Sequence, residues 1–208
     1  MRLDTDAIVC GTMAHGEHGA IVRLLTPDHG LIAAYVRGGR GRRMSPVLIP
    51  GNVVSAHMRW RSESQLPQAT LELVHSRAPI LAEPLPSAAV EWATVLAAAA
   101  LPERQSHPRI HGALAGLLDA VEAAPSASGW GGALARFELL VVAELGYGSP
   151  AESLPPWLGD GRGMDWKDIH AALELSGASL FREILVDRTS SLRSCRARLV
   201  DRLERMSP

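Results

Sequence analysis

The chain has 208 residues, of which 47% are hydrophobic and 21% are charged, and its formal net charge at pH 7 is -1. This composition is typical of a folded protein with one large domain or two small ones. The two cysteines, Cys10 and Cys195, lie far apart in the sequence, so neither a zinc ribbon nor a CxxC redox motif is supported. Because we find neither a long uncharged apolar stretch nor a signal peptide, we expect a cytoplasmic protein without a membrane segment.

The net charge hides an asymmetry between two parts of the chain. Residues 1–80 contain nine arginines and six acidic residues, whereas residues 81–208 contain twelve basic and sixteen acidic residues. A basic part is suited to a polyanion, and an acidic part is better suited to a protein partner. We therefore expect the two parts to have different tasks.

The first part has the pattern of short strands separated by tight turns. Turn signals such as the Pro-Asp-His-Gly segment at 27–30 separate runs of apolar or alternating residues. These runs predict strands at 7–13, 20–26, 31–37, 53–61 and 69–75. Five short strands in a small basic unit predict a closed barrel of the OB-fold type over residues 1–80.

The second part, residues 81–208, has the hydrophobic period of helices. After a proline-rich linker, Ser87 is a candidate N-cap for a helix that runs to about Ala100. Apolar stripes predict further helices at 110–121 and 130–145, the latter ended by Gly146, and at 191–206. Residues 146–165 show no clear period and are predicted to be an irregular insertion. The fold class is therefore α+β, with a β-barrel followed by an all-α domain.

The strongest functional signal follows the third predicted strand. Residues 37–43 contain four arginines and three glycines, the arginines being Arg37, Arg40, Arg42 and Arg43. A guanidinium group binds phosphate with a planar two-pronged fork, and glycine lets the backbone approach a ligand closely. We predict that this loop binds phosphate groups or a nucleic acid, and the alternative is a charged loop that only keeps the barrel soluble.

Further residues of the barrel extend this prediction. Arg59 and Arg61 share one face of the fourth predicted strand, and Arg23 lies on the second. If these faces adjoin, they extend the positive field of the loop into a track. Tyr35 has the same strand parity as Arg37 and could face the ligand. Because aromatic residues are scarce, we expect binding dominated by the nucleic-acid backbone, with little sequence preference.

The sequence does not favour an enzyme. It contains no nucleophile elbow, no phosphate loop of the GxxxxGK type and no dinucleotide fingerprint after a strand. His15, Glu17 and His18 have a spacing that fits no established metal site. We predict no catalytic residue, no metal and no cofactor.

Two segments resemble a known family. Residues 6–43 contain a Gly-Glu turn, a strand ending in Leu-Leu-Thr, a His-Gly turn and a basic Gly-Arg loop, in that order. Residues 135–148, ARFELLVVAELGYG, contain an Arg-Phe-Glu-Leu helix that ends in Leu-Gly-Tyr-Gly. Both segments resemble the RecO family of recombination mediators, and the two matches lie in different predicted domains.

The resemblance implies a non-enzymatic role in DNA repair and recombination. RecO proteins bind single- and double-stranded DNA through the barrel and anneal complementary strands. With RecR, they help RecA to displace the single-stranded DNA-binding protein SSB. They also bind the C-terminal tail of SSB in the helical domain, and the resemblance assigns this contact to Arg136.

The chain departs from many RecO proteins in one respect. A cysteine zinc ribbon commonly follows the Leu-Gly-Tyr motif, but residues 148–165 contain no cysteine, so we expect that the ribbon is lost. Two other functions remain open. The chain could be a protein-interaction adaptor whose arginines are only solubilising, or an enzyme whose catalytic residues are dispersed in the sequence.

Overall fold

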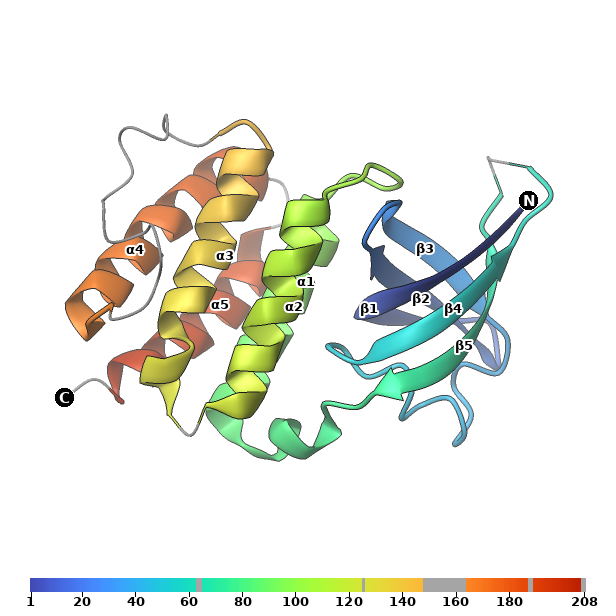
Figure 1. Ribbon diagram of the computed structural model, residues 1–208, viewed down its shortest axis with the longest axis horizontal. Coiled ribbons are helices and arrows are strands. Elements are labelled where there is room, and N and C mark those ends of the chain that lie inside the picture. The colour runs from blue at the N-terminus through green and yellow to red at the C-terminus, as the bar shows by residue number, and fades with distance from the viewer. Residues whose placement is uncertain (63–64, 125, 148–163, 187–188, 207–208) are drawn as a thin grey trace.

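The computed structural model describes residues 1–62, 65–124, 126–147, 164–186 and 189–206. Figure 1 shows a β-barrel beside a group of helices, with the N-terminus on the barrel and the C-terminus on the far side of the helices. Most of the predicted insertion at 146–165 lies outside the described residues, and so does most of the segment from which the zinc ribbon is expected to be lost.

The barrel is closed by five strands in the order β1-β2-β3-β5-β4. The β3–β5 pair is parallel, and the other four pairs are antiparallel. This order and the small size of the barrel confirm the expected OB-type architecture. The strands are β1 (Arg2–His15), β2 (Gly19–Thr26), β3 (Gly30–Val36), β4 (Val53–Arg59) and β5 (Gln68–His75).

Alternation of buried and exposed residues forms the interior of the barrel. On β4, Val54, Ala56 and Met58 are fully buried, while the residues between them face outward. Strand β1 is longer than predicted and begins at Arg2. Its charged first residues belong to the strand because they pair in register with β4, from Arg2 opposite Arg59 onward.

Strand β4 is shorter than predicted, because it ends at Arg59 and leaves Arg61 in the connection to β5. Both neighbouring strands begin opposite Arg59, β1 at Arg2 and β5 at Gln68. Trp60 still meets the first residue of the chain, since its amide donates to the Met1 carbonyl and its own carbonyl accepts from the Met1 ammonium group at 2.7 Å. The prediction that Arg59 and Arg61 share a strand face is therefore wrong.

The helical part begins three residues after β5 and contains five α-helices among the described residues. Short helices η1 (Ala78–Ala82) and η2 (Ala127–Gly129), and the π-helical turn η5 (Leu180–Ile184), connect or extend them. The α-helices are α1 (Pro84–Ala100), α2 (Pro108–Ala123), α3 (Gly131–Glu144), α4 (Trp166–Ser179) and α5 (Thr189–Glu204). None of the described helices is long and apolar enough to cross a membrane.

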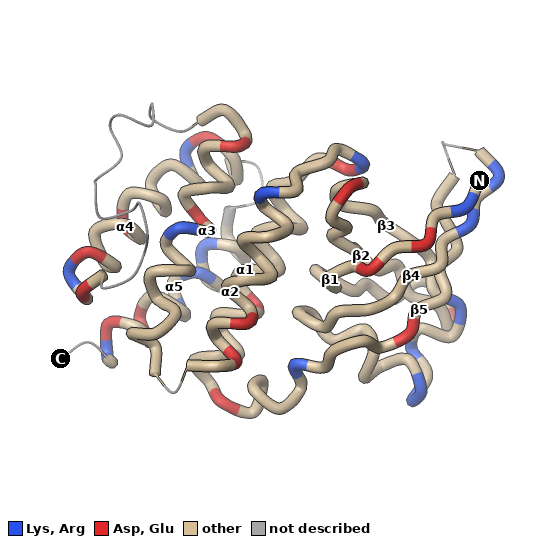
Figure 2. Tube along the Cα trace, viewed as in Figure 1, with Lys and Arg blue, Asp and Glu red and all other residues tan. Residues whose placement is uncertain are grey.

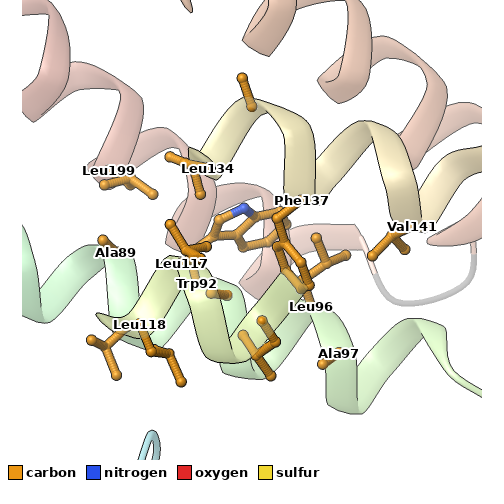
Figure 3. Packing of buried hydrophobic residues seen from close by; sticks show 14 of the residues in the cluster. Ala89, Trp92, Leu96, Ala97, Leu117, Leu118, Leu134, Phe137, Val141 and Leu199 are labelled. Atoms are coloured by element: carbon orange, nitrogen blue, oxygen red, sulfur yellow. The ribbon is translucent and has the colours of Figure 1, made fainter. Parts of the chain in front are cut away.

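The predicted apolar stripes form the core of this part. Figure 3 shows Trp92 of α1 surrounded by side chains from several helices, with Phe137 and Leu134 of α3 close to it. Trp92, Leu134 and Phe137 are all fully buried, as is Leu199 of α5. The helices therefore share one hydrophobic core.

The start and the end of the helices test the predicted caps. Helix α1 begins at Pro84, so the prediction that Ser87 is its N-cap is wrong. Proline fits the first turn, where the backbone N–H has no helical partner. Helix α3 ends as predicted: Gly146 has a φ of 86°, and Tyr147 donates its amide to the Val142 carbonyl at 3.0 Å. These two features are those of a Schellman cap.

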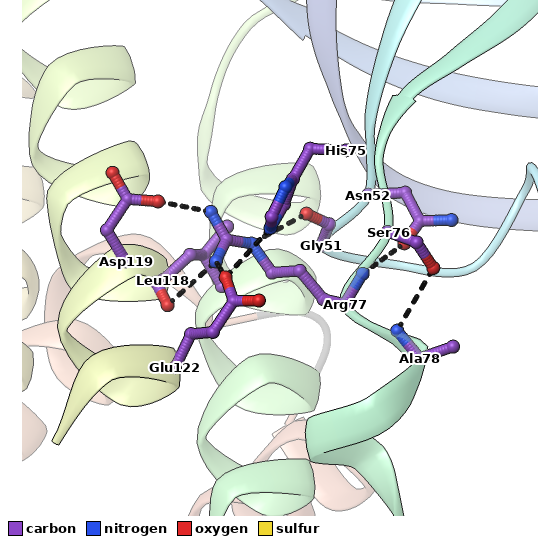
Figure 4. Close-up of polar contacts among 9 residues, drawn as sticks. All are labelled: Gly51, Asn52, His75, Ser76, Arg77, Ala78, Leu118, Asp119 and Glu122. Atoms are coloured by element: carbon purple, nitrogen blue, oxygen red, sulfur yellow. Dashed lines mark hydrogen bonds and ion pairs between the residues drawn. The ribbon is translucent and has the colours of Figure 1, made fainter.

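The barrel is packed directly on the helices. Ile8, Cys10, Leu25 and Leu31 lie on the outside of the barrel strands and belong to the hydrophobic core of the helical part. A buried arginine, Arg77, completes this junction with polar contacts (Figure 4). The other side of the barrel, away from the helices, remains available for a ligand.

Candidate nucleic-acid interface

The basic loop, which we define as residues 37–43, is folded into successive turns. Gly38 has a φ of 68°, a conformation that favours glycine, and the Gly41 amide donates to the Gly38 carbonyl at 2.9 Å. Just after the loop, Met44 and Leu48 pack against the interior cluster of the barrel. The loop is thus held to the barrel at both ends while its arginines project from turns.

Three of the four loop arginines are available to a ligand. Arg37, Arg42 and Arg43 are exposed, and none of them forms an ion pair with a carboxylate in the part of the chain that the structure describes. Figure 2 shows basic residues gathered on the barrel at this loop and near the N-terminus, away from the helices. Exposed guanidinium groups without an internal carboxylate attract phosphate more strongly than paired ones.

Arg40 has a different environment from its neighbours. Its guanidinium group donates to the Glu17 carbonyl at 3.1 Å and to the Gly16 carbonyl at 3.4 Å, and its amide donates to the His18 carbonyl at 3.2 Å. Arg40 therefore ties the basic loop to the β1–β2 turn. Two of its N–H groups are used in this way, and the rest of the exposed side chain can still contact a phosphate.

Beside the loop, the barrel surface contains a hollow of about 710 Å³ that we call the Tyr35 hollow. Tyr35 and His15 meet in it edge to face, with ring centroids 5.8 Å apart. The hollow is lined by residues 15–19, Tyr35, Arg37, Gly38, Leu66 and Gln68. The prediction that Tyr35 and Arg37 face the same side of the barrel is consistent with this arrangement.

A second hollow of about 480 Å³ adjoins the first, and Gln68 lines both. We call it the Arg59 hollow, and it is lined by Arg2, His57, Arg59, Gln68 and Thr70. Arg59 is exposed and has no ion pair with a described carboxylate. Arg59 therefore adds a positive charge at the end of this surface that lies away from the basic loop.

Strand pairing explains why the two hollows are continuous. Tyr35 lies opposite Gln68, Gln68 opposite Arg59, and Arg59 opposite Arg2, so these outward residues form one row across four strands. Since neighbouring strands are about 4.8 Å apart, the row crosses roughly 14 Å of surface. This row and the basic loop together form what we call the barrel interface.

Arg2 and His57 hold a carboxylate at the edge of the barrel interface. Asp4 accepts hydrogen bonds from the His57 ring at 2.8 Å and from Nε of Arg2 at 2.7 Å. The hydrogen bond with His57, together with the contact with Arg2, lowers the pKa of Asp4 below its usual range. Arg59 and Arg61 are both exposed, and neither forms an ion pair with a carboxylate of a described residue.

Arg23 does not extend the barrel interface, which corrects the expected track. Its guanidinium group donates to the Ala98 carbonyl of α1 and forms an ion pair with Glu103 at 3.5 Å. The outer face of β2 is covered at this point by the end of α1. Arg23 therefore stabilises the contact between the barrel and the helices.

Arg136 lies in the helical part, on α3, and is half-buried. Its Nε and Nη2 atoms are inaccessible to solvent and have no hydrogen-bond partner among the described residues. Buried guanidinium nitrogens without an acceptor are rare and need an explanation.

Sequence reasoning missed Arg2, Gln68 and Arg77. Arg2 and Gln68 complete the row, but only the strand register brings them beside Arg59. Arg77 has no sequence signal that separates it from an exposed arginine. Among the described residues, no three His, Cys, Asp or Glu side chains are grouped as a metal site would require.

Two family models match this chain. The model described as "Recombination protein O N terminal" matches residues 1–77, and the model described as "Recombination protein O C terminal" matches residues 84–152. The chain belongs to the RecO family. The two RecO matches cover the barrel and the first three α-helices, and they confirm the resemblance carried by residues 6–43 and 135–148.

Individual RecO proteins are similar over most of the chain. The DNA repair protein RecO of Gluconacetobacter diazotrophicus is 33% identical over an alignment of 250 positions, which covers 100% of this chain and 97% of the relative. That of Xanthobacter autotrophicus is 33% identical and covers 96% of both chains. That of Phenylobacterium zucineum is 40% identical over 149 residues, 71% of this chain and 60% of the relative.

Proposed function

We propose that this RecO family protein is a non-enzymatic, DNA-binding mediator of repair and recombination. Its relatives are named DNA repair proteins, which supports the general role. In our proposal it binds single- and double-stranded DNA by phosphate contacts and promotes the annealing of complementary strands. With RecR, it helps RecA to load onto DNA that is coated with SSB.

The observation that carries the proposal is the charge of the barrel interface. Arg37, Arg42, Arg43 and Arg59 are exposed there and have no ion pair with a described carboxylate. Contacts between arginines and phosphates release counterions from the DNA and do not depend on the base sequence. Arg40 supports the same surface by fixing the basic loop on the β1–β2 turn.

Phosphate binding also explains how annealing would be promoted. Two complementary strands repel each other through their backbones, and this repulsion opposes their encounter. Guanidinium groups on one surface neutralise part of that charge, so the strands approach each other more readily. No covalent step and no nucleotide hydrolysis are required.

The two cysteine thiols of the chain are both buried. Burial raises the pKa of Cys10 to about 12 and the pKa of Cys195 to about 11, so both thiols stay protonated at neutral pH. The described groups with shifted pKa values, these two cysteines, Asp4 and His111, lie on β1, α2 and α5.

The proposed protein partners are RecR and the C-terminal tail of SSB. We assign the tail to Arg136 because the family resemblance places this contact there, and a guanidinium group can bind a terminal carboxylate in a bidentate pair once a rearrangement of its surroundings exposes Nε and Nη2. This partner site lies on the helices, whereas the DNA site lies on the barrel. One molecule can then hold DNA and the protein that coats it at the same time.

The experiment that tests the proposed function compares the wild type with a protein that carries both Arg42→Ala and Arg43→Ala. Fluorescence anisotropy measures binding to labelled single-stranded and double-stranded DNA, and a second assay follows annealing of two complementary oligonucleotides. We expect roughly tenfold weaker binding to both DNAs, or about 1.4 kcal/mol, and slower annealing.

A protein with both Arg198→Ala and Arg205→Ala is the matched control, because it also loses two positive charges, from α5 and the turn after it, where Arg198 pairs with Glu91 and Arg205 with Asp201. It should bind and anneal DNA like the wild type. If the Arg42→Ala, Arg43→Ala protein also behaves like the wild type, the arginines are solubilising. The chain would then be better described as a protein-interaction adaptor.

A further inference from the structure

The Tyr35 hollow has features that phosphate binding alone does not require. Tyr35 is half-buried and meets His15 edge to face. A Cβ atom on Gly19 would lie 2.3 Å from Cε2 of Tyr35, so the ring occupies its position only because residue 19 is glycine. The barrel thus makes room for an aromatic side chain at its surface.

The other walls of the hollow combine apolar and polar groups. Leu66 is 43% exposed, and Gly16 and Gly38 present backbone without side chains. Gln68 contributes an amide, which has both hydrogen-bond donors and an acceptor. An aromatic ring with an amide beside it matches the flat face and the polar edge of a nucleobase.

Positive charge lies on both sides of this hollow. Arg37 lines one side, and beyond Gln68 the Arg59 hollow begins. Among the described residues that line the hollow, Glu17 is the one acidic residue, and its side chain is 93% exposed and 3.9 Å from His18. A nucleic-acid strand whose phosphates contact Arg37 and Arg59 would place one of its bases over Tyr35.

We propose that the Tyr35 hollow holds one unpaired nucleobase and thereby gives the barrel a preference for single-stranded DNA. The proposal rests on the proposed DNA-binding function and adds to it a binding site for one base. In a duplex the bases are stacked and paired inside the helix, so a duplex contacts the arginines and leaves the hollow empty. A single strand uses both the arginines and the hollow, and any of the bases can stack on the ring.

The test measures binding of three fluorescent DNAs of equal length: oligothymidine, an abasic oligonucleotide with the same backbone, and a duplex. The variants are Tyr35→Leu, which removes the ring, Tyr35→Phe, which keeps it, and Arg42→Ala. Stacking of one base predicts that Tyr35→Leu binds oligothymidine roughly tenfold more weakly. It should bind the abasic strand and the duplex within about twofold of the wild type, and Tyr35→Phe should behave like the wild type.

The pattern of losses separates this proposal from the proposed function. Equal losses on all three DNAs, or no loss on any of them, for Tyr35→Leu would overturn the base site; the second result would fit a hollow that serves a protein partner. Arg42→Ala should weaken binding to all three DNAs. A protein that binds none of them would instead overturn the proposed function.

A second measurement uses only the wild-type protein, so it does not require that any variant folds. Wild-type protein is irradiated with an oligonucleotide that contains 5-bromodeoxyuridine, and the crosslinked peptide is identified by mass spectrometry. The crosslink is expected within the residues that line the Tyr35 hollow. A crosslink confined to the helices would contradict the proposal.

Discussion

Arg77 shows how much the environment of one arginine can differ from that of another. It is 2% exposed, and its Nε donates to the Gly51 carbonyl at 3.2 Å while Nη1 donates to the Leu118 carbonyl at 3.0 Å. Its guanidinium group also forms ion pairs with Asp119 and Glu122 of α2, as Figure 4 shows. One side chain thus joins the barrel to the helices.

Arg77→Ala should therefore destabilise the protein strongly. The change removes a donor from two carbonyl groups and from two carboxylates, of which Glu122 keeps the His75 ring as a partner. We expect a loss of roughly 2–4 kcal/mol in the free energy of unfolding. Urea unfolding followed by circular dichroism measures this loss. Asp119→Asn is the control, because Asp119 is 70% exposed and should contribute about 1 kcal/mol or less. Equal, small losses for both variants would show that the junction does not depend on Arg77.

At this scale the sequence predicts the type of residue and not its environment. The density of arginine at 37–43 correctly indicated a basic loop, and it could not show that Arg40 binds the carbonyls of the β1–β2 turn. Arg23 likewise looked like part of a track and instead contacts Ala98 and Glu103. Each of these contacts joins residues more than twenty positions apart, so it depends on how the strands and helices pack.

Glu138 on α3 connects four helices through one buried carboxylate. Its side chain accepts from Nε1 of Trp92 on α1 at 2.6 Å, and from Ser176 on α4. It also accepts two hydrogen bonds from Arg196 on α5, at 2.9 Å and 2.7 Å. A buried charge needs such partners, because burial without them is very costly.

Removing the carboxylate should therefore weaken the contact between these helices. Glu138→Ala leaves the guanidinium group of Arg196, whose side chain is 12% exposed, without its counter-charge, and we expect a loss of roughly 3–5 kcal/mol. Arg198→Ala removes an ion pair with Glu91 in which both side chains are about half exposed, and should cost about 1 kcal/mol or less. Thermal and urea unfolding compare the two; similar values would contradict the structural role of Glu138.

The elements themselves were largely predictable, and their ends less so. The apolar stripe at 110–121 identified the buried face of α2, because a period of 3.6 is a local property. The end of α3 at Gly146 was also predictable, since a positive φ favours glycine. The start of α1 was not, because Ser87 and Pro84 both fit a helix N-terminus and the tertiary packing decides between them.

The molecule as a whole divides its proposed tasks between the barrel and the helices. Binding of DNA is assigned to the barrel interface, and binding of the SSB tail to Arg136 on α3. Composition predicted this division through the basic first part and the acidic second part. It could not predict the row formed by Tyr35, Gln68, Arg59 and Arg2, because that row results from pairing between four strands.

The two sites should be separable by mutation. Arg136→Ala is expected to bind a labelled peptide with the sequence of the SSB tail at least tenfold more weakly, while its affinity for DNA stays within about twofold of the wild type. A peptide with the same sequence and an amidated C-terminus lacks the terminal carboxylate. It should bind the wild type as weakly as the unmodified peptide binds Arg136→Ala.

Arg109→Ala is the matched control for Arg136→Ala. Arg109 is 73% exposed and pairs with Glu144 at the end of α3, so its loss removes a positive charge near the same helix. If Arg136→Ala binds the peptide normally, or if Arg109→Ala is equally impaired, then Arg136 does not receive the terminal carboxylate.

The most direct test of the central claim is the salt dependence of binding to single-stranded DNA. The logarithm of the affinity is measured against the logarithm of the salt concentration for the wild type and for the protein with both Arg42→Ala and Arg43→Ala. Loss of two phosphate contacts predicts a slope that is shallower by about 1.4, or about 0.7 for each contact. A wild-type affinity that does not fall with salt, or identical slopes for the two proteins, would contradict the account.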